Sequence, residues 1–154
     1  MTIFANLLRG IKSMTTSNEF VLHDYLDSQI GARNGYEEQF QPPDHIIENL
    51  KELHENLIKP LMDFMYGGKF VISSGYRCPR VNKKAGGAGR SQHMTGMAVD
   101  LKYVRDNQMD NGEIINTLIM LDLPFDQCID EFNLSWVHLS FDPSRNRRQL
   151  LKIG

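Results

Sequence analysis

Two histidines and one aspartate, each within its own short motif, limit the fold of this chain more than any other feature. The motifs are Ser91-Gln92-His93, Gly96-Met97-Ala98-Val99-Asp100 and Trp136-Val137-His138. Two imidazoles and one carboxylate are the ligand set of an open zinc site, whose fourth position is left to water. The helical HExxH pair is absent, so three separate segments must converge through turns and strands. We therefore predict that His93, Asp100 and His138 bind Zn²⁺.

Length and charge indicate one compact domain without a polyanionic partner. The 154 residues, 41% of them hydrophobic, suit a single core, and we divide them into an N-terminal extension, 1–16, and a single domain, 17–154. A formal net charge of −2 gives no field that would hold a nucleic acid. We interpret the basic run at Arg145, Arg147 and Arg148 as solvated surface, and we expect a monomer.

The cysteines and the N-terminus bear on the compartment. Cys78 and Cys128 lie fifty residues apart and have no metal-ligand spacing, so we expect free thiols, although one bridge between them stays open. Apolar residues before Met14 are interrupted by Asn6, Arg9 and Gly10, which argues against a signal peptide. No stretch is long enough to span a bilayer.

Apolar spacing predicts three helical regions. The clearest follows Pro42-Pro43, with Asp44 as N-cap and a stop at Gly67-Gly68; Pro60 should kink or split it. Its apolar positions are Ile46, Leu50, Leu53, Leu57, Leu61 and Met65. An earlier segment from Phe20 should end near Gly31 or Gly35, and a later helix should start at an Asp110–Glu113 capping box and end at Leu123-Pro124.

Short apolar runs predict the strands. Residues 69–74 form one, and the alternation around Asp100 places its side chain opposite Met97, Val99 and Leu101. The runs 127–132 and 135–141 should pair as a hairpin. The expected fold is therefore α+β, with helices packed on a small antiparallel sheet.

At this point the chain resembles a known family. The matching positions are Ser73, Gly75-Tyr76-Arg77, Asn82, Gly86-Gly87, Ser91-Gln92-His93-Met94, Gly96, Ala98, Asp100 and Trp136-Val137-His138. From about Phe20 to Phe141 they resemble the zinc D-alanyl-D-alanine carboxypeptidases, a group that includes phage L-alanyl-D-glutamate endolysins and D-Ala-D-Ala dipeptidases. The resemblance implies a LAS/hedgehog-like metallopeptidase fold with zinc at the sheet face, and a hydrolase acting on peptidoglycan peptides of the cell wall. Without a signal peptide, such an enzyme fits a phage or prophage lysis protein acting after release, or a cytoplasmic bacterial enzyme.

The general base is one of two neighbouring carboxylates. If Asn133-Leu134 is a two-residue turn, Glu131 pairs with Trp136 and shares a face with His138, at roughly 7 Å along the diagonal. A three-residue turn would instead set Asp130 opposite His138. The resemblance favours Glu131, because the similar subfamily has a Glu-Phe pair before Trp-Val-His. Many relatives carry a base or histidine where this chain has Ser135, and serine cannot replace it.

Three further residues are candidates for substrate binding. Arg77 follows a predicted strand and offers a planar fork for a carboxylate. By resemblance Arg77, helped by Ser91, would hold the terminal carboxylate of the substrate or polarise the scissile carbonyl, and Gln92 would add an amide contact. Two alternatives stay open: a non-catalytic zinc-containing binding module of the same fold, and a closed structural site with Cys78 as fourth ligand.

Overall fold

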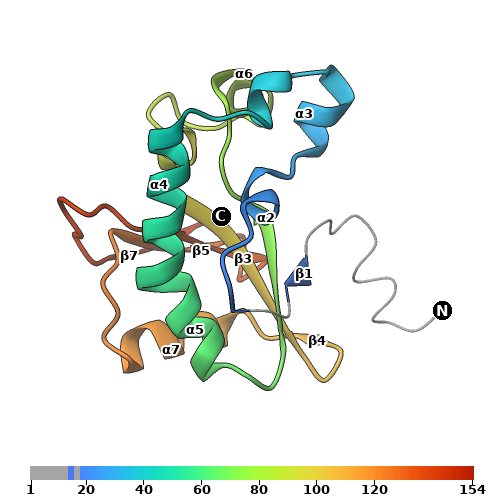
Figure 1. Cartoon of the computed structure of the whole chain (residues 1–154). Helices are drawn as coiled ribbons and strands as arrows, with labels where there is room; N and C mark the ends of the chain where they lie inside the picture. Colours follow the sequence, from blue (N-terminus) through green and yellow to red (C-terminus); the bar gives the residue numbers. More distant parts are fainter. Residues whose placement is uncertain (1–13, 16–17) are drawn as a thin grey trace.

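The computed structural model describes residues 14–15 and 18–154 and contains one mixed sheet with helices on it (Figure 1). The strands are β1 (Met14–Thr15), β2 (Lys69–Ser74), β3 (Ala98–Arg105), β4 (Gln108–Met109), β5 (Gln127–Glu131), β6 (Trp136–Ser140) and β7 (Gln149–Ile153). They are ordered β1-β2-β3-β6-β5-β7, with β4 beside β3. Every pair is antiparallel except β5 with β7. The predicted α+β class is confirmed.

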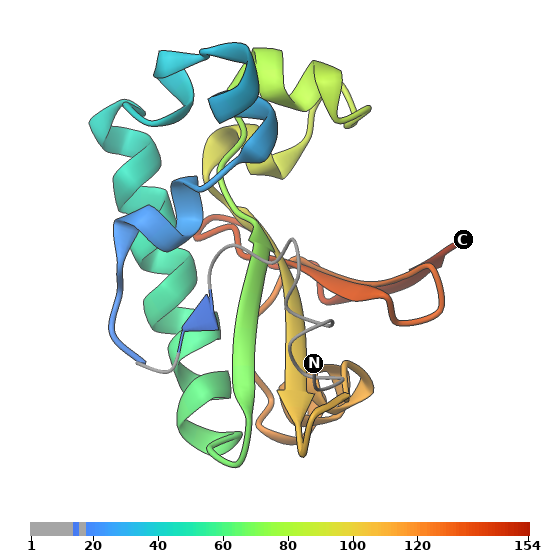
Figure 2. The same ribbon diagram turned by 90° about the vertical axis from the view of Figure 1, so that its right-hand side faces the viewer.

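Helices cover the sheet on one face and at its ends. They are α2 (Leu22–Leu26), α3 (Gln29–Asn34), α4 (Asp44–Leu53), α5 (Lys59–Phe64), α6 (Pro79–Lys84) and α7 (Gly112–Met120). Figure 2 shows α4 and α5 on one side of β2 and β3, while the strands near the C-terminus extend to the other side. Alternate residues of β3, namely Val99, Leu101 and Tyr103, belong to the buried core with the helices. Asp100 therefore lies on the opposite face, as predicted.

The long amphipathic helix passes Pro60 without breaking. All six apolar positions predicted for it are buried, because they form one stripe that faces the sheet. Between α4 and α5 the segment His54–Ile58 is a π-helix, and Pro60 lies in the first turn of α5, where its missing N–H costs least. The predicted disturbance at Pro60 thus takes the form of one widened turn. Asp44 is the first helical residue, and Pro43 holds the N-cap position assigned to Asp44.

Other sequence predictions need correction at the helix ends. The segment after Phe20 forms two short helices rather than a single one. The second ends at Gly35, one of the two predicted ends, where a φ of 66° supplies the left-handed cap. The capping box at Asp110 is wrong. Asn111 is the N-cap of α7, and its side chain instead bonds to the backbone of Tyr103, Leu134 and Ser135.

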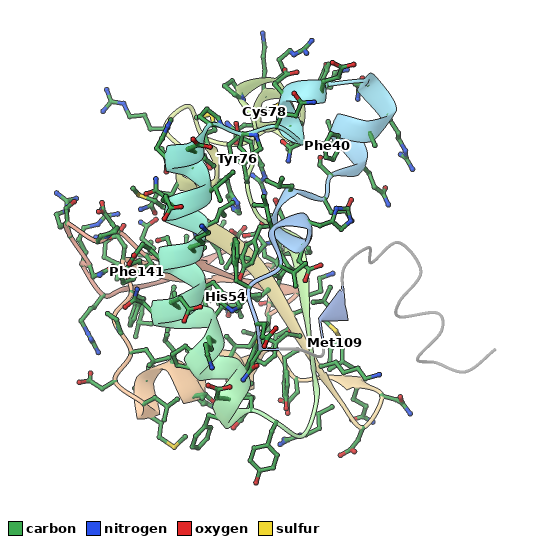
Figure 3. All side chains as sticks on the ribbon, viewed as in Figure 1. Phe40, His54, Tyr76, Cys78, Met109 and Phe141 are labelled. Atoms are coloured by element: carbon green, nitrogen blue, oxygen red, sulfur yellow. The ribbon has the colours of Figure 1, made fainter. Side chains whose placement is uncertain are left out.

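His54 is a buried histidine outside the candidate zinc site. His23 and His45 are exposed, but His54, the first residue of the π-helical segment, is only 1% exposed (Figure 3). Its Nδ1 lies 2.7 Å from the Tyr25 hydroxyl and its Nε2 lies 2.9 Å from the Asn18 carbonyl oxygen. The two hydrogen bonds satisfy both ring nitrogens, so a core histidine is tolerated.

The C-terminal strand β7 is absent from the sequence predictions. All five of its residues are exposed, and the adjacent Leu150 and Leu151 interrupt the apolar alternation of a half-buried strand. Its only strand partner among the described residues is β5. The predicted extension 1–16 lies outside the described residues apart from 14–15. Both cysteines are free and buried, and none of the helices in the described ranges is long and apolar enough to cross a membrane.

Candidate metal centre and its cleft

Three side chains predicted as ligands converge at the centre of the sheet. Asp100 on β3 pairs directly with His138 on β6, which brings the two side chains to the same face. His93 comes from a 3₁₀ turn, Gln92–Thr95, capped by the Ser91 hydroxyl and ended by Gly96 at φ 72°. One ligand atom from each of the three residues lies within 4.8 Å of the others.

Hydrogen bonds fix which ring nitrogens face the centre. His93 Nδ1 lies 2.7 Å from the Gly75 carbonyl oxygen, so it must carry the proton and donate it there. This leaves Nε2 of His93 toward Asp100 Oδ1 at 3.2 Å, while His138 presents Nδ1 to the same oxygen at 3.1 Å. A carbonyl on the outer ring nitrogen is the usual way to orient a metal-binding imidazole. His93 is thus prepared to donate its Nε2 lone pair to a cation.

Asp100 is an ionised carboxylate in a buried position. Burial acts to raise its pKa, but the charges and hydrogen bonds of His93 and His138 outweigh burial and hold the pKa of Asp100 well below its ordinary range. Arg77 Nη2 donates to its other oxygen at 3.0 Å. A deprotonated carboxylate is the form that binds metal.

The donor set fits a divalent cation with an open coordination position. Two imidazole nitrogens and one carboxylate oxygen are borderline and hard donors of the kind zinc accepts, and a cavity of about 720 Å³ adjoins them. Among the described residues, the group of side chains that could hold a metal ion does not include Cys78. Its thiol lies 3.9 Å from Glu38 Oε1, which speaks against a closed site with Cys78 as fourth ligand.

Glu131 lines the cavity that contains the three candidate ligands, whereas Asp130 does not. In the β5–β6 ladder Glu131 pairs with Trp136 and Asp130 with Val137, the register predicted for Glu131 to share a face with His138. The connection is longer than the predicted two-residue turn: Phe132, Asn133 and Leu134 all have positive φ, and Phe132 does not pair with Ser135. Asp130 Oδ1 accepts from Leu134 N at 2.6 Å, so this carboxylate is occupied in the turn.

Arg77 and Ser91 also line the cavity. Arg77 Nε donates to Ser74 Oγ at 2.9 Å, and its backbone N–H donates to His93 O at 3.0 Å. These bonds, with the ion pair to Asp100, hold the guanidinium beside the candidate metal ligands. Its remaining N–H donors are left for a substrate group.

The Gln92 side chain belongs to a hydrogen-bond network with Asp126 and Arg147 that was not predicted from the sequence. Its Nε2 donates at 2.9 Å to Oδ2 of Asp126, which is 2% exposed. Arg147 holds the same carboxylate through Nε and Nη2, each at 2.7 Å, and also lines the cavity. Arg147 is therefore a structural ion-pair residue rather than solvated surface. The hydrogen bonds from Arg147 lower the pKa of Asp126 to about 2.

Comparison with known proteins agrees with this geometry. The family model described as Peptidase M15 matches residues 19–140 of the chain. The chain belongs to the Peptidase M15 family. A comparison with curated proteins gives no match. Peptidases of the M15 family are zinc-dependent, and the His93, Asp100 and His138 cluster is a possible metal site of this M15 peptidase.

Gly75 explains how this M15 peptidase positions His93. A Cβ at residue 75 would lie 2.4 Å from Tyr25 O and 2.8 Å from Tyr25 Cα, so only glycine lets the two backbones approach. The close approach allows Tyr76 N to donate to Tyr25 O at 2.8 Å, while the Gly75 carbonyl accepts from His93.

We predict that Gly75→Ala lowers the free energy of unfolding by about 2 kcal/mol, because the methyl group must push backbone atoms apart. Zinc affinity should fall with it, since His93 loses its oriented acceptor. The measurements are urea unfolding and competition with a chromogenic zinc chelator. Gly89→Ala is the matched control, because a Cβ there meets nothing within 4 Å. Equal effects of the two variants would contradict this role for Gly75.

A second prediction concerns Arg147. Arg147→Met leaves the Asp126 carboxylate buried without its partner, so we expect the free energy of unfolding at pH 7 to fall by about 3 kcal/mol. Arg148→Met is the control: Arg148 pairs with Asp122, whose side chain is 86% exposed, and such a pair contributes about 0–1 kcal/mol. Urea unfolding of both variants measures the difference.

The Arg147 effect should also depend on pH. The folded pKa of Asp126 is depressed, so the stabilisation is present above the unfolded pKa of about 4 and is lost as pH falls toward 2. The gap in stability between the parent chain and Arg147→Met should therefore shrink between about pH 4 and pH 2. A gap that stays constant over this range would mean that Arg147 stabilises through packing alone.

Proposed function

We propose that this M15 peptidase hydrolyses peptidoglycan-type peptides, as a D-Ala-D-Ala carboxypeptidase or a related endopeptidase, with zinc held by His93, Asp100 and His138. The observation that carries the proposal is the convergence of these three side chains with Glu131 and Arg77 on one cavity of about 720 Å³. Bound there, zinc would supply Lewis acidity that lowers the pKa of a water molecule and polarises a carbonyl group.

The protein side chains then divide the proton transfers and the charge. A carboxylate oxygen of Glu131 accepts the proton of the water that attacks the peptide carbonyl, and returns it to the leaving nitrogen. The guanidinium of Arg77, oriented by Ser74 and Asp100, stabilises the developing oxyanion or holds the terminal carboxylate of the substrate. Ser91 and the side-chain oxygen of Gln92 supply further polar contacts at the cavity wall.

The alternative is a zinc-containing domain of the same fold that binds a partner without turnover. A carboxylate base and an arginine that keeps N–H donors for a substrate, both on the same cavity, favour catalysis, since a binding module needs neither. Incubation with purified peptidoglycan or a defined muropeptide, followed by mass spectrometry of the released fragments, separates the two. The fragment masses also identify the bond that is cleaved. Zinc-loaded protein that binds muropeptide but releases no fragment would support the alternative.

Zinc binding gives the first prediction of this proposal. The purified protein should bind one Zn²⁺ per chain, and His138→Ala should weaken binding by at least about 100-fold because a direct ligand is lost. Chelator competition measures the affinity. His45→Ala, at an exposed histidine outside the cavity, should bind zinc like the parent chain. Unchanged affinity in His138→Ala would contradict the ligand assignment.

The base gives the second prediction. Glu131→Gln should keep zinc and lose on the order of 10³-fold in kcat, because an amide cannot accept the proton. Steady-state hydrolysis of the muropeptide by zinc-loaded protein measures the loss. Asp130→Asn is the comparison, since Asp130 caps the turn through Leu134 N and lies outside the cavity lining. A larger loss in Asp130→Asn than in Glu131→Gln would reverse the assignment of the base.

A further inference from the structure

A second cavity adjoins the metal cavity across Arg77. Its volume is about 330 Å³, and it shares Arg77 and Ala85 with the metal cavity. The other walls come from α3 with its N-cap Ser28, from β2, from α6 and from the loop residue Tyr76, and they contain hydroxyl groups and apolar side chains. The side chains of Arg77 and Ala85 therefore form the common border of the two cavities.

Lys102 supplies the cationic group of this second cavity. It follows Asp100 by two residues on β3, so both side chains leave the same face of the sheet, about 7 Å apart along the strand. An extended peptide advances about 3.3 Å per residue, so Lys102 is within reach of a substrate residue next to the scissile bond or one further. The side chain is half-buried, and no ion pair or hydrogen bond joins it to any residue in the described ranges.

An ammonium group in a half-buried cavity requires an acceptor, because burial removes part of its hydration. Arg77, the other cation of this cavity, already pairs with Asp100 through Nη2. Asp27 is the acid among the described lining residues, and Lys102 is the lining cation that is not paired with Asp100. Because no hydrogen bond or ion pair joins the Lys102 ammonium to any described residue, it favours a ligand that brings a carboxylate rather than a neutral amide.

We propose that the cavity around Lys102 is a substrate subsite that selects a peptide with a free carboxylate near the scissile bond over the same peptide with that group amidated. This inference rests on the proposed peptidase function and refines its substrate class. Stem peptides of peptidoglycan offer the necessary pair, because their glutamyl and diaminopimelyl carboxylates can be free or amidated.

The experiment compares one stem peptide with free glutamyl and diaminopimelyl carboxylates and its diamide, both with a free C-terminus. The parent chain should show a kcat/KM at least about ten-fold higher for the free acid, the size expected for one charged hydrogen bond. Lys102→Met should remove this preference by lowering kcat/KM on the free acid, with less than about two-fold change on the diamide. Lys102→Arg should keep most of it. Lys51→Met, which removes an exposed lysine paired with Glu48 on α4, should behave like the parent chain.

Binding separates this inference from the proposed function. Calorimetry with zinc-loaded Glu131→Gln, alone and combined with Lys102→Met, measures the Kd of both peptides without hydrolysis. A preference of Glu131→Gln for the free acid that disappears with Lys102→Met supports the subsite even if the zinc-loaded parent chain cleaves neither peptide. Failure of the parent chain to cleave either peptide would instead overturn the peptidase activity. Equal affinity of both peptides for Glu131→Gln would overturn the subsite. An equal loss of affinity for both peptides on adding Lys102→Met would overturn it as well.

Discussion

The buried carboxylate of Asp100 is the interaction on which the rest of this structure depends. One oxygen lies beside His93 and His138 and the other accepts from Arg77, so three segments meet at a single side chain. A lone carboxylate in this position would be costly to bury, and it is tolerated because every neighbour is a donor or a potential cation. The same arrangement suits a divalent ion, which can take the place of the imidazole protons that face one oxygen of Asp100.

The sheet provides the precision that this cluster needs. The pairing of Asp100 with His138 is enforced by a ladder whose core face is buried, because a slip of either strand by one residue would turn its own side chains to the other face and separate the two groups. The third candidate ligand, His93, comes from a loop that hydrogen bonds hold at several points. His93 Nδ1 donates to Gly75 O, the Arg77 backbone N–H donates to His93 O, and Gln92 donates to Asp126. Arg147 extends this support to the C-terminal segment, which closes one wall of the cleft.

Much of the site was predictable because its chemistry is carried by short motifs. His93, Asp100 and His138 meet as expected, and Glu131 faces them because the hairpin register follows from the spacing of the strands. The role of Glu131 as base stays a prediction. The Asp126–Arg147 pair was not predictable, since its partners are 21 residues apart and neither belongs to a recognisable motif. β7 was not predicted for a different reason. Its residues are all exposed and do not alternate between apolar and polar, so its strand conformation depends on pairing with β5.

The sequence by itself determined the four central strands, the long amphipathic helix and the three candidate ligands, because periodicity and motif spacing are local properties of the chain. Tertiary structure decided how the helix passes Pro60, why His54 is buried against Tyr25, and which acid pairs with Arg147. It also decided that Lys102 lines a cavity that shares Arg77 and Ala85 with the cavity of the candidate metal site. These outcomes depend on contacts between residues distant in the chain, whose energies become available only when the sheet and its helices have assembled.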